Sequence, residues 1–172
     1  MENKLQHCSN KKVILIICIL LGLVVCILPL LLFHEASLWA NNADVEGNRA
    51  EFDTIAELLM DEYGDEDEKK LIFGYNPEEK RSYLYDYSEE VYVELTAEQQ
   101  AALEAVAEAA TNDGTFNSVT VTKDRVTFHT VDGSYALVYS VNGRPKYGNS
   151  PDEDAQIRIK AAGGDWYHIA VR

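Results

Sequence analysis

The sequence predicts an α+β protein, in which an N-terminal transmembrane helix precedes a small domain with an antiparallel meander sheet packed against two helices. Three observations lead to this fold class. Residues 13–33 form an unbroken apolar run, two later stretches carry apolar residues at helical spacing, and the final third alternates short β-type runs with tight-turn sequences. These features divide the 172 residues into a tail (1–12), an anchor (13–33), a stem (34–47) and an α+β domain (48–172).

The apolar run at residues 13–33 has the properties of a membrane-spanning helix. It contains no charged, hydroxyl or amide side chain, and at helical rise it spans roughly 31 Å, the thickness of a bilayer core. Lys11-Lys12 precedes it and Glu35 follows it, so the positive-inside bias places the tail in the cytoplasm and the domain outside. Leu38 and Ala40 offer a weak cleavage site for the alternative, a signal peptide. Signal peptides have a shorter apolar core, so we expect an uncleaved single-pass anchor in the cell membrane.

The domain begins with a helical pattern. Its apolar residues recur at spacings of three and four and are separated by acidic residues, which predicts an amphipathic helix ending at Gly64; they are Phe52, Ile55, Leu59 and Tyr63. Residues 65–70 are all charged and predict an exposed loop. A short apolar run at residues 71–73 follows, and Gly74 and Asn76-Pro77 are expected to end it.

A tyrosine-rich strand is expected next. Tyr83, Tyr85 and Tyr87 alternate with other residues, so in a strand all three rings share one face. Residues 91–95 alternate apolar and polar side chains, which is typical of a half-buried strand.

The rest of the chain predicts one helix and then strands only. Thr96 and Gln99 form a capping box in front of an alanine-rich helix at residues 97–110. Strands are expected after Gly114, because β-branched and aromatic residues alternate there and hairpin turns punctuate them; the turns include Asp132-Gly133 and Asn142-Gly143, on either side of residues 135–141. Strands joined by tight turns predict an antiparallel meander, and the two helices are available to cover one of its faces.

Composition excludes several classes of function. The chain has 15 Lys and Arg against 29 Asp and Glu, and the first 33 residues hold three of the basic and one of the acidic residues. The remainder therefore carries 12 basic and 28 acidic residues, which argues against binding nucleic acid through phosphate contacts. The three cysteines are Cys8, Cys18 and Cys26, so the domain has no disulfide and no thiol nucleophile. It also lacks Asn-x-Ser/Thr acceptors, and both absences favour a bacterial source.

A search for catalytic and metal-binding patterns identifies no site. His129 and His168 lie within expected strands without a third ligand at fixed spacing, so we interpret both as ordinary sheet residues. Nucleophile-elbow, phosphate-loop and dinucleotide motifs are absent. The acidic stretches 65–68 and 152–154 lack the alternating carboxylates and glycine of a calcium loop. The sequence therefore predicts a non-enzymatic protein with no cofactor and no metal.

The tyrosines suggest the function. Tyrosine offers rigid contact area with a hydroxyl at its tip, which suits contact with another protein, so Tyr83, Tyr85 and Tyr87 are the candidate partner surface. Their alternative interpretation is an edge strand whose rings pack on a neighbouring helix. We expect an interaction or assembly module with a protein partner, held at the membrane by its anchor. The alternative function is a small-ligand-binding or hydrolytic domain with a pocket between sheet and helix, for which the candidates are His129, Trp166 and His168.

Overall fold

The computed structural model describes residues 43–110, 116–146 and 157–171. All of them belong to one unit of the chain, residues 41–172. The expected tail, the anchor, most of the stem and the acidic stretch 152–154 lie outside the described residues. Within the part that is described, no helix is both long enough and apolar enough to cross a membrane.

The first predicted helix is present as α2 (Arg49–Tyr63). Three of the four pattern positions and one alanine are buried, and Tyr63 is half-buried against the core; the buried residues are Phe52, Ile55, Ala56 and Leu59. The helix ends at Gly64, whose N–H donates to the carbonyl of Met60 over 2.9 Å.

The second predicted helix is present as α3 (Ala97–Ala109), and its capping box is confirmed. The Gln99 N–H donates to the Thr96 hydroxyl over 3.2 Å, and the Thr96 N–H donates to the Gln99 side-chain oxygen over 2.9 Å. These two bonds satisfy backbone donors that the first helical turn leaves without a partner. Leu103 and Val106 lie fully buried on the inner side of this helix.

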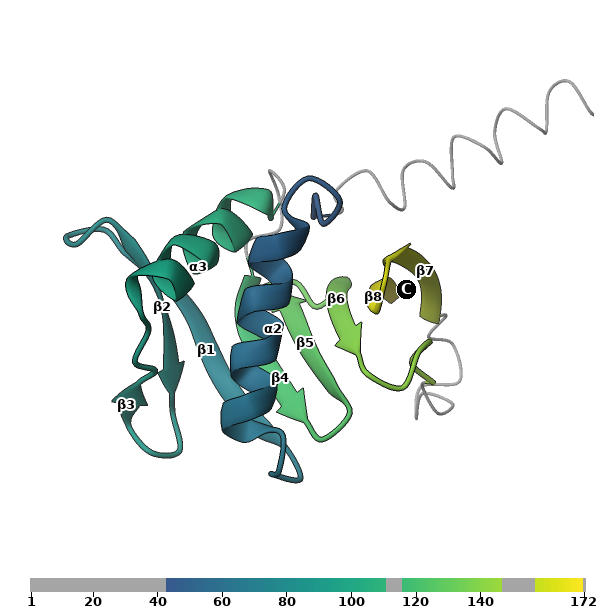
Figure 1. Cartoon of the computed structure of the whole chain (residues 1–172), viewed down its shortest axis with the longest axis horizontal. Helices are drawn as coiled ribbons and strands as arrows, with labels where there is room; N and C mark the ends of the chain where they lie inside the picture. The colour runs from purple at the N-terminus through teal and green to yellow at the C-terminus, as the bar shows by residue number, and fades with distance from the viewer. Residues whose placement is uncertain (1–42, 111–115, 147–156, 172) are drawn as a thin grey trace, which may run out of the picture. The chain divides into compact units, whose positions relative to one another are not determined.

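Eight strands form one antiparallel sheet, in the order β3-β2-β1-β4-β5-β6-β8-β7 (Figure 1). Together with the two helices, this sheet confirms the predicted α+β domain. The strands are β1 (Lys69–Asn76), β2 (Arg81–Asp86), β3 (Val91–Tyr92), β4 (Phe116–Thr122), β5 (Arg125–Thr130), β6 (Tyr135–Ser140), β7 (Ile157–Gly163) and β8 (Trp166–Val171).

The prediction of an exposed loop over residues 65–70 is wrong at its C-terminal end, because Lys69 is the first residue of β1 and is only 6% exposed. Its ammonium lies 2.6 Å from the Asp86 carboxylate and 5.4 Å from the ring centre of Tyr63. Asp86 lies 17 residues further along the chain, so the run of charged residues alone does not reveal that Lys69 has a buried partner. β1 also continues through Gly74 to Asn76.

The strand expected over residues 91–95 is shorter than predicted. Only Val91 and Tyr92 form β3, and both are exposed. The Val93 N–H still donates to the carbonyl of Leu84. Val93 and Leu95 then pack against the hydrophobic core, which explains their apolar character.

The meander is interrupted at its C-terminal end, because β8 lies between β6 and β7. Tight turns join β4 to β5, β5 to β6 and β7 to β8, as a meander requires. Residues 141–156 connect β6 to β7, and this longer connection lets β7 take the outer position. Gly143 makes its expected turn with a φ of 75°, but no strand follows that turn directly.

The end of the expected stem packs into the domain. Ala43 and Val45 are buried at 4% and 2% exposure, and the Asp44 N–H donates to the carbonyl of Ala109 over 3.1 Å. Small apolar residues alternate here with the exposed Asp44 and Glu46, and the chain turns over residues 45–48 before α2 begins.

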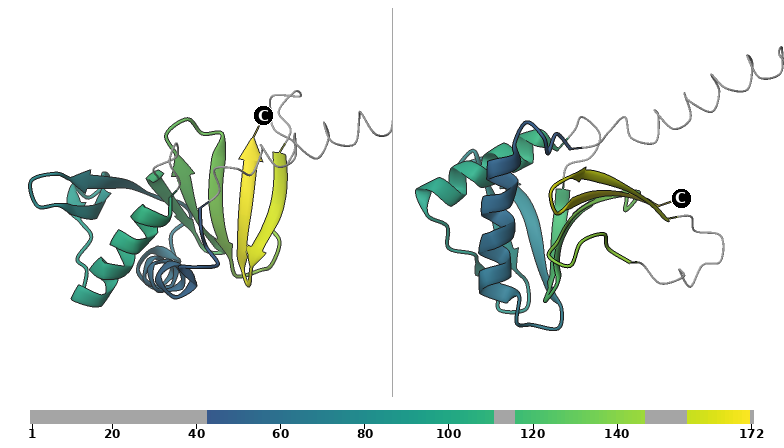
Figure 2. Two further views of the ribbon diagram at one scale, coloured as in Figure 1. Left: turned by 90° about the horizontal axis from the view of Figure 1, so that it is seen from above. Right: turned by 45° about the vertical axis from the view of Figure 1, so that its right-hand side comes forward.

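Both helices lie on the same face of the sheet (Figures 1 and 2), with α2 over β4 and β5 and α3 over β2. The core between these layers is aromatic at its centre. The Phe128 ring centre lies 6.2 Å from that of Phe52, 5.3 Å from Phe116 and 6.1 Å from Trp166. A second, smaller cluster of buried residues packs around Val138.

Candidate functional site

Two of the three predicted tyrosines share one face of the sheet. Tyr83 and Tyr85 lie on β2 and alternate with the buried Ser82, Leu84 and Asp86, so their rings point away from the helices. Tyr87 lies just beyond the end of β2, in the turn to β3, and is 74% exposed. The structure therefore places Tyr87 beside the row and not within it.

A third ring completes this surface, and it comes from the neighbouring strand. Tyr92 on β3 pairs with Tyr85, and their ring centres lie 5.0 Å apart; the rings of Tyr83 and Tyr92 lie 5.4 Å apart. Both pairs meet edge to face, the arrangement that aromatic rings favour. Ile72 on β1 pairs with Tyr85 and is 40% exposed. We call Ile72, Tyr83, Tyr85 and Tyr92 the tyrosine face.

The surface predicted from the sequence did not include Tyr92, because only the pairing of β2 with β3 brings this residue onto the same face. Its signal was present in the alternation of residues 91–95, which places Tyr92 opposite in orientation to Val91. Gly74 on β1 pairs with Tyr83, and a Cβ atom at Gly74 would overlap the Tyr83 ring. The glycine thus gives the ring room to lie flat across β1.

A buried ion pair fixes the turn beside the tyrosine face. Asp86 accepts hydrogen bonds from the Ser88 N–H and hydroxyl over 2.9 and 2.7 Å and from the Glu89 N–H over 3.2 Å, in addition to its contact with Lys69. Burial alone would raise the pKa of Asp86, but the hydrogen bonds from Lys69, Ser88 and Glu89 outweigh it and lower that pKa. The turn that carries Tyr87 is therefore held by an ionised carboxylate.

The two domain histidines lie on opposite faces of the sheet. His129 pairs with Ala136, which pairs with Ile169, whereas His168 is one residue earlier on β8 and points to the other face. The His129 Nε2 lies 3.1 Å from the Thr120 hydroxyl. Burial, and to a smaller extent Lys70, lowers the pKa of His129. The two imidazoles cannot act on one ligand.

Trp166 belongs to the hydrophobic core. It is fully buried, and its indole N–H donates to the Asp53 carboxylate on α2 over 2.7 Å. Phe52 packs edge to face against it with ring centres 5.3 Å apart. Of the three alternative pocket residues, His168 lines the cavity beside residues 43–49.

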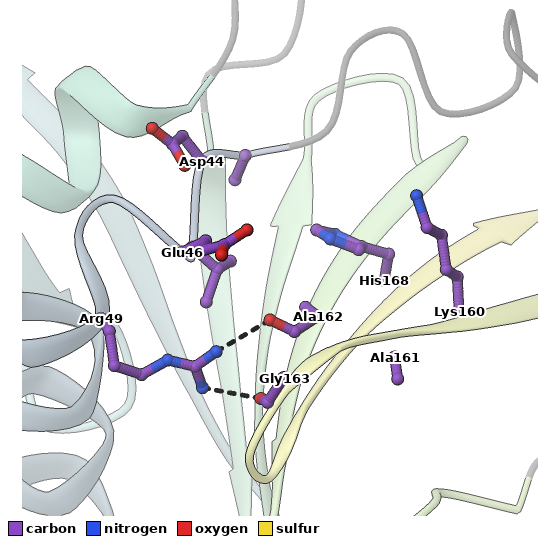
Figure 3. A pocket seen from close by; sticks show the side chains of 10 residues that line it. Asp44, Glu46, Arg49, Lys160, Ala161, Ala162, Gly163 and His168 are labelled. Carbon is purple, nitrogen blue, oxygen red and sulfur yellow. Dashed lines mark hydrogen bonds between the residues drawn. The ribbon is translucent and has the colours of Figure 1, made fainter.

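The pocket beside His168 has a volume of about 500 Å³ and lies between residues 43–49 and the β7–β8 hairpin (Figure 3). Arg49 closes one side, because its guanidinium donates to the carbonyls of Ala162 and Gly163 over 2.8 and 2.7 Å. Lys160 projects from β7 on another side (Figure 3).

A hydrogen-bond chain links Ala43, Tyr135 and His168. The Ala43 N–H donates to the Tyr135 hydroxyl over 3.3 Å, and that hydroxyl lies 2.8 Å from His168 Nδ1. Burial, and to a smaller extent Lys160, lowers the pKa of His168 to about 4, and burial raises the pKa of Tyr135. The lowered pKa keeps the His168 imidazole neutral at pH 7, with its Nδ1 hydrogen-bonded to the Tyr135 hydroxyl.

The titratable side chains that line this pocket are Asp44, Glu46, Arg49, Lys160 and His168. Its described lining contains no serine, threonine or cysteine near His168 to act as a nucleophile. Nor do the described residues contain a group of three or more His, Cys, Asp or Glu side chains able to hold a metal ion.

Comparison of the chain with protein-family models, curated proteins and solved structures returned no match.

Proposed function

We propose that this protein is a membrane-anchored interaction module, whose domain stands outside the membrane and binds an extended, basic segment of a partner protein along β3 and the tyrosine face. One observation carries the proposal: the Tyr92 ring packs edge to face on both Tyr83 and Tyr85, on the sheet face away from the helices and at the terminal strand β3. The anchor is the apolar run at residues 13–33, with the tail in the cytoplasm.

The tyrosine face suits protein contact because it offers apolar area that is already ordered. Tyr92 is 65% exposed and Ile72 is 40% exposed, while the edge-to-face contacts hold the three rings in place. A preorganised aromatic surface loses little conformational entropy on binding, and tyrosine is enriched among the residues that dominate interface energies.

The edge of β3 favours an extended partner. β3 is the last strand on its side of the sheet, so its outer backbone groups have no neighbouring strand in the described domain. A peptide that pairs with such an edge gains main-chain hydrogen bonds, and alternate side chains then reach the flanking face. The short length of β3 leaves room for the partner strand to continue along the turn.

Charge favours a basic partner. Glu89 and Glu90 in the turn and Glu94 after β3 are all exposed, and residues 34–172 have 28 acidic against 12 basic side chains. Lysine and arginine side chains gain from these carboxylates and from the faces of the tyrosine rings.

Photo-crosslinking in cells tests this proposal. The full chain carries a photoreactive phenylalanine at Tyr87 or, as the matched control, at Val131, which is 70% exposed in the β5–β6 turn. We expect a defined adduct from position 87 only, and mass spectrometry should locate the crosslink in a lysine- and arginine-rich segment. Equal adducts from both positions, or a crosslinked segment without excess basic residues, would overturn the proposal.

Two double variants that each remove two negative charges test whether the carboxylates near β3 attract a basic partner. Glu89→Gln with Glu94→Gln should reduce the adduct at least fivefold, whereas Glu57→Gln with Glu62→Gln, two exposed sites on α2, should leave it unchanged. Tyr92→Ser should also reduce the adduct while the circular dichroism spectrum of the protein stays unchanged. Loss of folded structure in Tyr92→Ser without loss of the adduct would show that the ring is structural.

A further inference from the structure

A second cavity lies on the other face of the sheet, between α3 and the ends of β1 and β4. Its volume is about 420 Å³, within the range of small-ligand pockets. It is separate from both the tyrosine face and the His168 pocket, and it shares no lining residue with either.

The inner wall of this cavity is aromatic. Phe73 and Phe116 are 7% and 3% exposed, and their ring centres lie 6.2 Å apart in an edge-to-face arrangement. Ala107 on α3 faces them, and its small side chain leaves open the space that a larger residue would fill. Tyr75 stands at the cavity and is 58% exposed.

The outer wall carries two carboxylates, Glu104 and Glu108, one helical turn apart on α3. Glu104 is held in a fixed orientation: its carboxylate accepts from the Ser82 N–H over 2.6 Å, from the Ser82 hydroxyl over 2.8 Å and from the Gln100 amide over 2.8 Å. The ion pairs among the described residues involve neither glutamate.

The two glutamates give this wall a local excess of negative charge. Carboxylates four residues apart on a helix repel each other, and nearby apolar surface strengthens that repulsion. A cation between them would relieve the repulsion, and the aromatic rings behind them would accept the apolar part of the same molecule.

We propose that this cavity binds an organic cation, in which an ammonium or guanidinium group lies between Glu104 and Glu108 and an apolar body packs on Phe73 and Phe116. This is a ligand-binding function beyond the proposed partner surface. The cation is either a free amine or a lysine or arginine side chain of another protein, because both present the same chemistry.

Titration of the full chain in mild detergent with three probes tests the proposal. The probes are phenethylamine, its neutral analogue 2-phenylethanol, and N-acetyl-lysine methylamide, with binding followed by calorimetry or by ligand-observed NMR. We expect one of the two cations to bind at least tenfold more tightly than 2-phenylethanol. Tighter binding of phenethylamine supports a free amine, and tighter binding of the lysine derivative supports a protein side chain.

Three variants separate the site from unspecific binding. Glu108→Gln should weaken the preferred cation at least tenfold, while Glu98→Gln, an exposed first-turn residue of the same helix, should have no effect. Ala107→Leu should fill the cavity and abolish binding while the circular dichroism spectrum is kept. Equal binding of the neutral analogue, no binding of either cation at millimolar concentration, or equal weakening by Glu98→Gln would overturn the proposal.

Discussion

His168 should make the stability of the domain depend on pH. Its imidazole is 7% exposed, and its pKa in the folded domain is about 4 against an ordinary value of 6.5. In the unfolded chain the imidazole takes up a proton as the pH falls below about 6.5, whereas in the folded domain it stays neutral until about pH 4. Because the folded pKa is lowered, the stabilisation is complete above pH 6.5 and is lost as the pH falls.

The expected magnitude follows from these two pKa values. Between pH 7 and pH 5, proton uptake by the unfolded chain at this one residue should lower the free energy of unfolding by about 2 kcal/mol. His129 acts in the same direction, because burial lowers its pKa as well. Urea unfolding of the full chain in mild detergent, followed by tryptophan fluorescence at pH 7, 6 and 5, measures the effect.

Two variants assign the effect to His168. His168→Gln keeps an acceptor for the Tyr135 hydroxyl and should remove about 2 kcal/mol of the change between pH 7 and pH 5, whereas His129→Gln should remove only its own share. NMR titration of the imidazole resonances measures the pKa directly. A His168 pKa near 6.5, or an unchanged pH dependence in His168→Gln, would refute the reasoning.

Three further predictions concern stability, measured by urea unfolding. Phe128→Ala should lower the free energy of unfolding by about 3–5 kcal/mol, and Phe128→Leu by less than about 1.5 kcal/mol, because Phe128 contacts four other core rings; similar losses in both would argue against tight ring packing. Thr96→Ala should cost about 1 kcal/mol and speed amide exchange in the first turn of α3, since it removes the cap; unchanged exchange there would contradict the role of the cap. Lys80→Gly should raise stability by about 1 kcal/mol, because Lys80 has a φ of 53° that glycine adopts without strain, and a loss of stability would mean that the lysine side chain has a structural role.

The features that sequence reasoning predicted correctly are local ones. The spacing of Phe52, Ile55 and Leu59 depends only on helical geometry, and the Thr96–Gln99 box closes within one turn. Hairpin turns depend on a few neighbouring residues, so the strands on either side of Asp132-Gly133 were also identified.

The features it missed depend on pairing between distant segments. The charged Lys69 can lie buried in a strand because its ammonium pairs with the Asp86 carboxylate. β8 lies inside the sheet because it pairs with β6, and β7 pairs with the other side of β8. Tyr92 joins the tyrosine face through the register of β3 with β2. The cavity beside Glu104 exists because α3 crosses the sheet where Ala107 faces two phenylalanines, and no local pattern encodes that crossing.

The internal position of β8 has a consequence for how the domain is made. β8 is the last described strand to be synthesised, yet it pairs with β6 on one side and β7 on the other and supplies Trp166 to the core. A nascent chain that lacks it has an open edge on β6 and an incomplete core, a state prone to pairing with other chains. The emergence of β8 from the ribosome should therefore be the step at which the domain becomes resistant to proteolysis.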